Sequence, residues 1–235
     1  MVELEDLKKS ITECQNKIDA ALKRANRTDK VTLIGATKLN PKELIEMIQS
    51  NNLLTDVGEN HVQEIQEKYE SGLNLNWHMI GQLQSNKVKY IIDKVVLIHS
   101  LDRESLAQEI NKQAIKHNKI MDCLIEVNMG SEITKGGIAK EELDSFMDML
   151  DKYPNIRIRG LMSVLPNMED KEALKNMYID FNHLYKHLQE IAKSNHKIDI
   201  LSCGMTNDYE LAIEYGGSTM VRLGRVLFGE RNYNK

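Results

Sequence analysis

The chain has 235 residues, a mass of 27.0 kDa and a net charge of −4, and charged residues of both signs make up 28% of it. This length can bury a full hydrophobic core, and the lack of a basic excess argues against a nucleic-acid or membrane-surface partner. The three cysteines, Cys14, Cys123 and Cys203, lie far apart with no CxxC spacing. They indicate reduced thiols rather than metal ligands or a disulfide framework. The N-terminus is acidic and no apolar run approaches a membrane span, so we expect a soluble, cytoplasmic protein.

The first predicted element is an amphipathic helix over residues 3–26, where apolar residues recur at helical spacing. A strand over residues 31–37 follows, and its apolar and β-branched residues run directly into Lys38. Asn40 is expected to cap the next helix, with Pro41 at its first position. The chain therefore begins with a helix, a buried strand and a lysine placed where that strand ends.

Strands and helices then alternate to the end of the chain. The seven further strands are predicted at residues 53–57, 75–80, 95–99, 123–127, 156–161, 198–201 and 218–223. A helix is expected after each strand but the last, including one over residues 60–69, one capped by Asp102 and one over residues 208–215. This alternation predicts a sheet whose strands all run in parallel.

Eight short apolar strands alternating with helices over this length are typical of a closed parallel barrel. The rival fold is a doubly wound open sheet, but that fold gives no reason to stop at eight strands. In addition, no glycine-rich dinucleotide fingerprint follows an early strand. We therefore predict an α/β protein, a (β/α)8 TIM barrel with an extra N-terminal helix. No linker divides the chain, so residues 1–235 are expected to form a single domain.

In such barrels the chemistry lies at the carboxyl ends of the strands, which we call the rim. The predicted rim is rich in amides, hydroxyls and glycines, and comprises Lys38, 58–60, 81–87, Ser100, Asn128, 162–163, 202–208 and 222–225. A lysine that is partly desolvated by apolar walls has more of the neutral amine that condenses with a carbonyl. The plainer interpretation of Lys38 is a solvated lysine that merely ends a strand.

The last two rim loops have the composition of a phosphate site. Residues 202–208 mix small residues and hydroxyls ahead of a helix, and Gly224 permits close backbone approach beside the cation of Arg225. The alternative is ordinary turn glycines with a helix cap at Asn207 or Asp208. A lysine able to form an imine and a phosphate site on one rim suggest a ligand with an aldehyde and a phosphate, which is the description of pyridoxal 5′-phosphate.

Several motifs together make the chain resemble a known family. They are residues 57–60 with 62–64, 77–81 with 83–87, 99–102, 127–128 with 135–136, 160–162, 201–206 with 208, and 221–224 with 228–231. On these motifs the chain is identified as a member of the pyridoxal phosphate homeostasis proteins, single-domain relatives of alanine racemase. The resemblance implies a fold type III barrel that binds pyridoxal phosphate, limits the free aldehyde and supplies the cofactor to apo-enzymes.

The resemblance also implies roles for individual residues. Lys38 matches the lysine that holds the cofactor as an imine (Schiff base), Asn60 an asparagine beside the pyridine ring, and Arg222 the arginine that faces the ring nitrogen. The residues matching the phosphate contacts and their surroundings are Ser202, Met205, Thr206, Gly224 and Arg225. The residues matching the strand that lines the pocket are His78 and Ile80. Departures from the usual pattern occur at Thr37, Gln82 and Cys203, none of which removes a group needed for the imine or the phosphate.

Arg222 favours holding the cofactor over transforming it. A guanidinium does not readily give up a proton, so a ring nitrogen opposite it stays unprotonated and is a weak electron sink. The alternative function is an amino-acid racemase, which needs a second base opposite Lys38. Alanine racemases take that base from a second domain, whereas this chain stops at Lys235, leaving Tyr209 and Tyr233 as candidates near the rim.

A third possibility is a lysine-dependent aldolase, which would need its lysine deep in the barrel beside acidic residues. We therefore expect a carrier with no catalytic residues, no metal site, no nucleic-acid or membrane partner, and apo-enzymes that use pyridoxal phosphate as its recipients. A small acidic domain favours a monomer.

Overall fold

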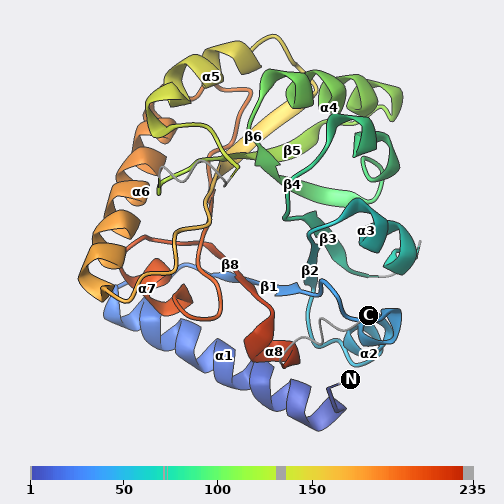
Figure 1. Ribbon diagram of the computed structural model, residues 1–235, viewed down its shortest axis with the longest axis vertical. Coiled ribbons are helices and arrows are strands. Elements are labelled where there is room, and N and C mark those ends of the chain that lie inside the picture. The colour runs from blue at the N-terminus through green and yellow to red at the C-terminus, as the bar shows by residue number, and fades with distance from the viewer. Residues whose placement is uncertain (1, 71, 73, 131–135, 230–235) are drawn as a thin grey trace.

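The computed structural model describes residues 2–70, 72, 74–130 and 136–229. Its strands all run in parallel, each pairs with the next in chain order, and β8 pairs with β1 (Figure 1). They are β1 (Thr32–Ala36), β2 (Asp56–Glu59), β3 (Asn76–Met79), β4 (Val95–Leu101), β5 (Met121–Glu126), β6 (Ile156–Met162), β7 (Ile200–Ser202) and β8 (Met220–Leu223). The sheet is therefore closed, and the predicted (β/α)8 TIM barrel is confirmed.

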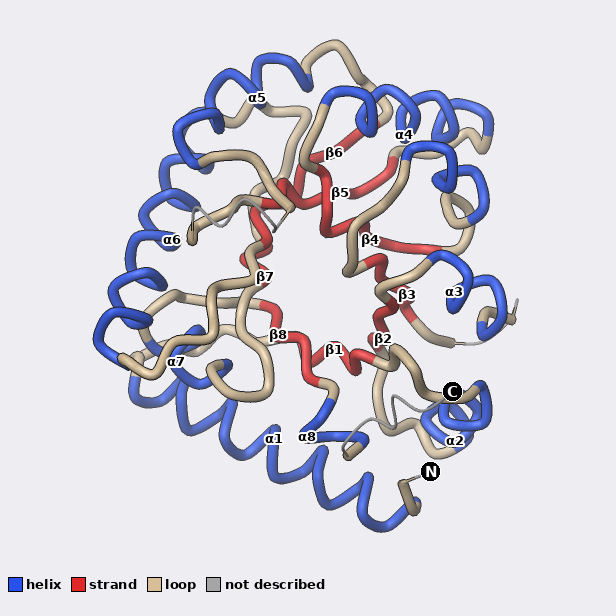
Figure 2. The backbone as a smooth tube through the Cα atoms, viewed as in Figure 1, coloured by secondary structure: helices blue, strands red, loops and turns tan. Residues whose placement is uncertain are grey.

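The helices form a ring outside the barrel (Figure 2). They are α1 (Leu4–Arg24), α2 (Lys42–Ser50), α3 (Val62–Lys68), η1 (Ser85–Tyr90), α4 (Glu104–Lys116), η2 (Lys140–Glu142), α5 (Leu143–Leu150), α6 (Lys171–Ile191), α7 (Tyr209–Glu214) and α8 (Arg225–Phe228). The predicted N-terminal helix is α1, which packs along α7 and α8 and buries Leu7 and Ile18. None of the helices built from described residues is long and apolar enough to cross a membrane.

Two predicted helix caps are wrong. Pro41 is the residue before α2, and the side-chain amide of Asn40 instead donates to the carbonyl oxygen of Lys38 (3.3 Å). Arg103 is the residue before α4, and its Nη1 donates to the carboxylate of Asp102 (2.6 Å). In each case a nearer local partner occupies the side chain that was expected to cap the helix.

The second strand starts three residues later and ends two residues later than predicted. The N–H of Leu53 donates to the carbonyl oxygen of Ile48 (2.9 Å), and Asn52 adopts a left-handed φ of 50°. These residues therefore close the end of α2 instead of starting a strand. As a result Glu59, which was predicted to lie on the rim, belongs to β2. Ser100, also predicted on the rim, belongs to β4, which continues to Leu101, and both side chains are buried.

Apolar side chains from five strands form one cluster inside the barrel: Ile34, Leu97, Leu124, Met162 and Met220. A larger apolar core lies between the strands and the surrounding helices. All three cysteines are buried and unpaired, as expected for reduced thiols. Burial raises the pKa of Cys203 to about 12, so this thiol is unreactive at neutral pH.

Candidate functional site

A cavity of about 400 Å³ lies at the carboxyl end of the barrel. The predicted site residues that line it are Lys38, Asn60, Ile80, Met205, Thr206, Arg222, Gly224 and Arg225. They come from the ends of β1, β2, β3, β7 and β8, so the lysine and both loops expected to bind phosphate meet in one cavity. His78 and Ser202 do not line it. Their side chains are buried and form hydrogen bonds with His99 and Arg222.

Four further lining residues were not predicted: Ala36 at the end of β1 and three residues that follow β6. Val164, Leu165 and Asn167 follow β6 and border the cavity together with Asn207 and Asp208 of the predicted phosphate loop. Their composition gives no signal of a site. Only their position just past the end of a strand could have indicated a role.

The turn that carries Lys38 has an unusual backbone. Lys38 is half-buried two residues after β1, and Leu39 has a left-handed φ of 62° although its side chain is 56% exposed. A non-glycine residue in this conformation is strained and needs support from its surroundings. The Leu39 side chain gains little burial, so the support must come from hydrogen bonds to the turn.

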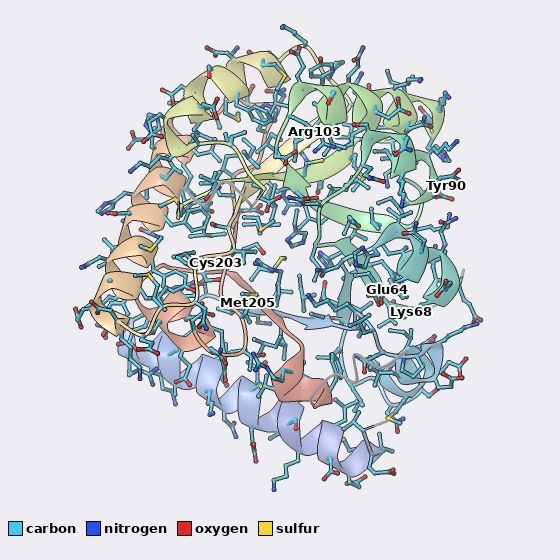
Figure 3. All side chains as sticks on the ribbon, in the orientation of Figure 1. Glu64, Lys68, Tyr90, Arg103, Cys203 and Met205 are labelled. Carbon is cyan, nitrogen blue, oxygen red and sulfur yellow. The ribbon has the colours of Figure 1, made fainter. Side chains whose placement is uncertain are left out.

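Those hydrogen bonds come from a buried cluster beneath the turn. The N–H of Leu39 donates to Oε1 of Glu64 (2.6 Å), and the Thr37 hydroxyl donates to Oε1 of Glu59 (2.7 Å). Nζ of Lys68 donates to the Thr37 carbonyl (3.0 Å), to Glu59 (2.8 Å) and to Glu64 (3.3 Å). Figure 3 shows Glu64 and Lys68 side by side on α3. Both residues that flank Lys38 are therefore tied to this cluster.

Glu59 makes stability depend on pH. Burial raises its pKa to about 7 against the opposing effect of Lys68. Between pH 4.5 and 7 the folded protein therefore retains a proton that the unfolded chain has released, and stability falls as the pH rises through this window.

We expect Glu59→Gln to remove this contribution. The stability of the variant relative to the natural protein should rise from pH 5 to pH 7.5, measured as the difference in thermal midpoint. Burial also raises the pKa of Glu126 to about 7, so part of the slope will remain, and Glu126→Gln serves as the matched comparison. A difference in midpoint that stays constant with pH would contradict the assignment to Glu59.

Arg222 is held by a chain of buried side chains that crosses the barrel. Its Nη1 donates to Oγ of Ser202 (2.6 Å), and its Nη2 donates to the Ser163 carbonyl (3.1 Å). Ser202 Oγ is 3.1 Å from Nδ1 of His99, and Nε2 of His99 is 3.0 Å from Nδ1 of His78. Nε2 of His78 lies 3.0 Å from Oδ1 of Asp56, at the start of β2.

One set of hydrogen-bond directions satisfies every polar atom in this chain. Asp56 accepts from Nε2 of His78, which leaves Nδ1 of His78 to accept from His99. His99 then accepts from the Ser202 hydroxyl, and the oxygen of that hydroxyl accepts from Arg222. Burial, with the nearby positive charge of Arg222, holds the pKa of His99 well below its usual range, so it stays neutral as this pattern requires. The chain orients the guanidinium that faces the cavity.

The loop after β7 is braced by the side chain of Asp208. Its Oδ1 accepts from the N–H of Met205 (2.6 Å), and it caps no N–H of α7. Gly204 has a φ of 95°, and a Cβ there would lie 2.7 Å from the Cβ of Ala212. The glycine therefore lets the loop fold back over α7, which presents Met205 and Thr206 to the cavity.

The loop after β8 begins the short helix α8. The carbonyl of Gly224 accepts from the N–H groups of Leu227 (3.0 Å) and Phe228 (2.9 Å). The N–H groups of the residues just after Gly224 are at the start of a helical turn, where no intrahelical acceptor exists for them. With the Thr206 hydroxyl and the Arg225 cation beside them, these groups can bind an anion.

Tyr209, one of the two tyrosines considered as a second base, does not line the described part of the cavity. Tyr209 is 4% exposed, and burial raises its pKa. After burial, the largest contribution to this shift comes from Cys14 of α1, on the outside of the barrel. Tyr233 lies outside the described residues, as do Lys135 and residues 230–231 of the motifs.

These features define a class of protein: a parallel (β/α)8 barrel with a lysine and an anion-binding pair of loops in a cavity at its carboxyl end. The family model "Alanine racemase, N-terminal domain" matches residues 13–232. Two relatives are the pyridoxal phosphate homeostasis proteins of Aquifex aeolicus and Escherichia coli strain K12. The first is 45% identical over 220 residues, covering 92% of this chain and 95% of the relative. The second is 34% identical over 247 residues, covering 99% and 100%.

Solved structures with the same fold include relatives of this family. The chain matches PipY of Synechococcus elongatus without PLP with a TM-score of 0.82 at 25% identity, over 95% of this chain and 100% of PipY. It matches an alanine racemase of Clostridium difficile with a TM-score of 0.73 at 16% identity, over 96% of this chain and 58% of the racemase. The chain belongs to the alanine racemase N-terminal domain family and, within it, to the pyridoxal phosphate homeostasis proteins, as the motifs predicted.

Proposed function

We propose that this protein binds pyridoxal 5′-phosphate through an imine with Lys38 and acts in the homeostasis of that cofactor. The observation that carries the proposal is the single cavity shared by Lys38, Thr206, Arg222 and Gly224. The relatives named above are pyridoxal phosphate homeostasis proteins, and a structure of PipY is described with PLP bound. Both descriptions support the same ligand here.

The residues fit the chemistry of that ligand. Lys38 supplies an amine for the aldehyde, the start of α8 supplies backbone N–H groups for the phosphate, and Arg222 supplies a fixed cation for the ring nitrogen. When bound, the cofactor supplies an aldehyde that exchanges between amines. The Lys38 amine would hold it by condensing with the aldehyde, forming a C=N bond and releasing one water, and hydrolysis of that bond would return the free amine and aldehyde.

The arrangement favours a carrier over a racemase. Arg222 is 5% exposed and donates to two fixed acceptors, so it gives the ring nitrogen no proton and the ring stays a weak electron sink. Among the described residues, the cavity lining includes no tyrosine opposite Lys38. We further propose that residues 1–235 act as one cytoplasmic, monomeric pyridoxal-phosphate-binding domain that delivers cofactor to apo-enzymes.

The absorption spectrum of the purified protein tests this function. Adding pyridoxal 5′-phosphate should produce the visible band of an imine, and borohydride should fix the cofactor to the peptide that contains Lys38. The loaded protein is then incubated with L-alanine and with D-alanine. Absence of the band would refute binding, and turnover at the rate of a dedicated racemase would refute the carrier.

Thr206→Ala should weaken cofactor binding without removing the imine. The variant loses one hydroxyl beside the anion-binding loops, which costs about 1–3 kcal/mol of binding free energy for a hydrogen bond to a charged group. The half-saturating concentration of pyridoxal 5′-phosphate should therefore rise while the final absorbance is unchanged. Thr206→Ser keeps the hydroxyl and should bind as the natural protein does. Equal affinities for the Ala and Ser variants would remove Thr206 from the phosphate site.

A further inference from the structure

We propose that Lys68 and Glu64 of α3 are positioning residues that hold the Lys38 side chain in the direction needed to reach the cofactor. The inference rests on the proposed function for the role of Lys38. It concerns residues outside the cavity, because neither Lys68 nor Glu64 lines it. The argument depends on where the hydrogen bonds of these two residues end.

Lys68 is 4% exposed, and three acceptors surround its ammonium group. An ammonium has three N–H donors, so these acceptors match its full capacity. One of them is the carbonyl of Thr37, directly before Lys38, and another is Glu64, which accepts from the N–H of Leu39, directly after it. The pair therefore grips the backbone on both sides of the lysine.

This grip explains how Leu39 keeps its left-handed conformation. The exposed side chain contributes little, whereas a hydrogen bond from its N–H to a carboxylate is charge-assisted and strong. The carbonyl of Thr37 accepts from Lys68 and also from the N–H of Asn40 (3.1 Å). With both flanking peptides fixed, the Cα–Cβ direction of Lys38 is set before any ligand arrives, which lowers the entropic cost of binding.

A stabilising role alone gives a poorer account of the cluster. Burying a lysine among carboxylates is costly, and buried ion pairs are often no more stabilising than apolar side chains of the same size. Here the buried charges bind the backbone of the turn that carries Lys38. Both charged residues belong to α3, where they are four residues apart. The hydrogen bonds from Lys68 and to Glu64 therefore fix the turn directly.

The test compares Lys68→Met and Glu64→Leu with Glu64→Gln, which keeps an acceptor oxygen, and with Lys119→Met as a matched control. Lys119 is half-buried and also donates to backbone carbonyls, those of Ile92 and Val95, far from the cavity lining. Two quantities are measured: the half-saturating concentration of pyridoxal 5′-phosphate from the imine band, and the exchange rate of the Leu39 amide hydrogen in the protein without cofactor.

Lys68→Met and Glu64→Leu should raise the half-saturating concentration roughly tenfold or more, as expected for loss of a charge-assisted hydrogen bond. The band should reach its full amplitude at high cofactor, since Lys38 is intact, and the Leu39 amide should exchange faster. Glu64→Gln should recover most of both properties, and Lys119→Met should change neither. If Lys68→Met does not fold, the Glu64 pair decides the question alone.

Unchanged affinity and unchanged Leu39 exchange in Glu64→Leu would overturn the positioning role. Failure of the proposed function is distinguishable from that result. A natural protein without an imine band would refute pyridoxal phosphate binding, whereas the Leu39 exchange rates would still decide whether Glu64 and Lys68 hold the turn.

Discussion

Lys38→Ala should give a folded protein that develops no imine band at any concentration of pyridoxal 5′-phosphate. The lysine is half-buried and follows β1 on a turn that the cluster beneath it supports through Thr37 and Leu39. Truncating it therefore removes the amine and leaves the supports of the turn in place. The circular dichroism spectrum and the thermal midpoint should stay close to those of the natural protein.

A nearby lysine provides the control for this prediction. Lys42 lies at the start of α2 and forms an exposed ion pair with Glu70, so Lys42→Ala should keep the imine band and the reduced adduct. Borohydride-resistant labelling of Lys38→Ala at another lysine would show that the cofactor is held elsewhere. Unfolding of Lys38→Ala would show that this lysine has a structural role.

Gly160→Ala should be the most damaging single change in the barrel, either preventing folding or lowering the free energy of unfolding by more than about 3 kcal/mol. Gly160 pairs with Ile200 of β7 and has a φ of 146°. A Cβ at this position would lie 1.8 Å from the carbonyl oxygen of Ile200, which is backbone and cannot move without opening the contact between β6 and β7. The barrel would lose its closure at that seam.

Gly229→Ala is the control that measures the cost of backbone strain without a steric clash. Gly229 also has a positive φ, 83°, but its Cβ would meet nothing within 4 Å. Gly229 combines this φ with a ψ of −177°, a region that essentially only glycine occupies, so the alanine should cost about 1–3 kcal/mol through backbone strain alone. Chemical denaturation of both variants measures the difference, and equal costs would show that the contact with Ile200 relaxes easily.

The number of strands and the cavity could be predicted from the sequence because both follow from local patterns. Each strand is a short apolar run, and the polar residues past its end must share the rim with the others once the sheet closes. The prediction therefore brought Lys38, Thr206 and Gly224 together although they are far apart in the chain. The cavity confirms that these three residues meet.

The buried supports of the site could not be predicted in the same way. Lys68 and Thr37 are 31 residues apart, and nothing in the pattern of α3 distinguishes a lysine that turns inward from one on a solvated helix face. His78 was expected on the pocket wall because the family resemblance placed its strand there. In the structure β3 ends at Met79, so Ile80 reaches the cavity and His78 faces the interior with His99. The helix α8 was not predicted either, because its four residues are too few to show the spacing of a helix.

The burial of all three native thiols makes the molecule well suited to site-specific labelling. Cys14, Cys123 and Cys203 are each no more than 1% exposed, so a maleimide has no native target while the barrel is folded. A cysteine introduced at Asn167, an exposed position at the cavity edge, would carry a single fluorophore. Arrival and departure of a ligand could then be timed by emission, in the presence of an acceptor enzyme, without mutating any native residue of the core.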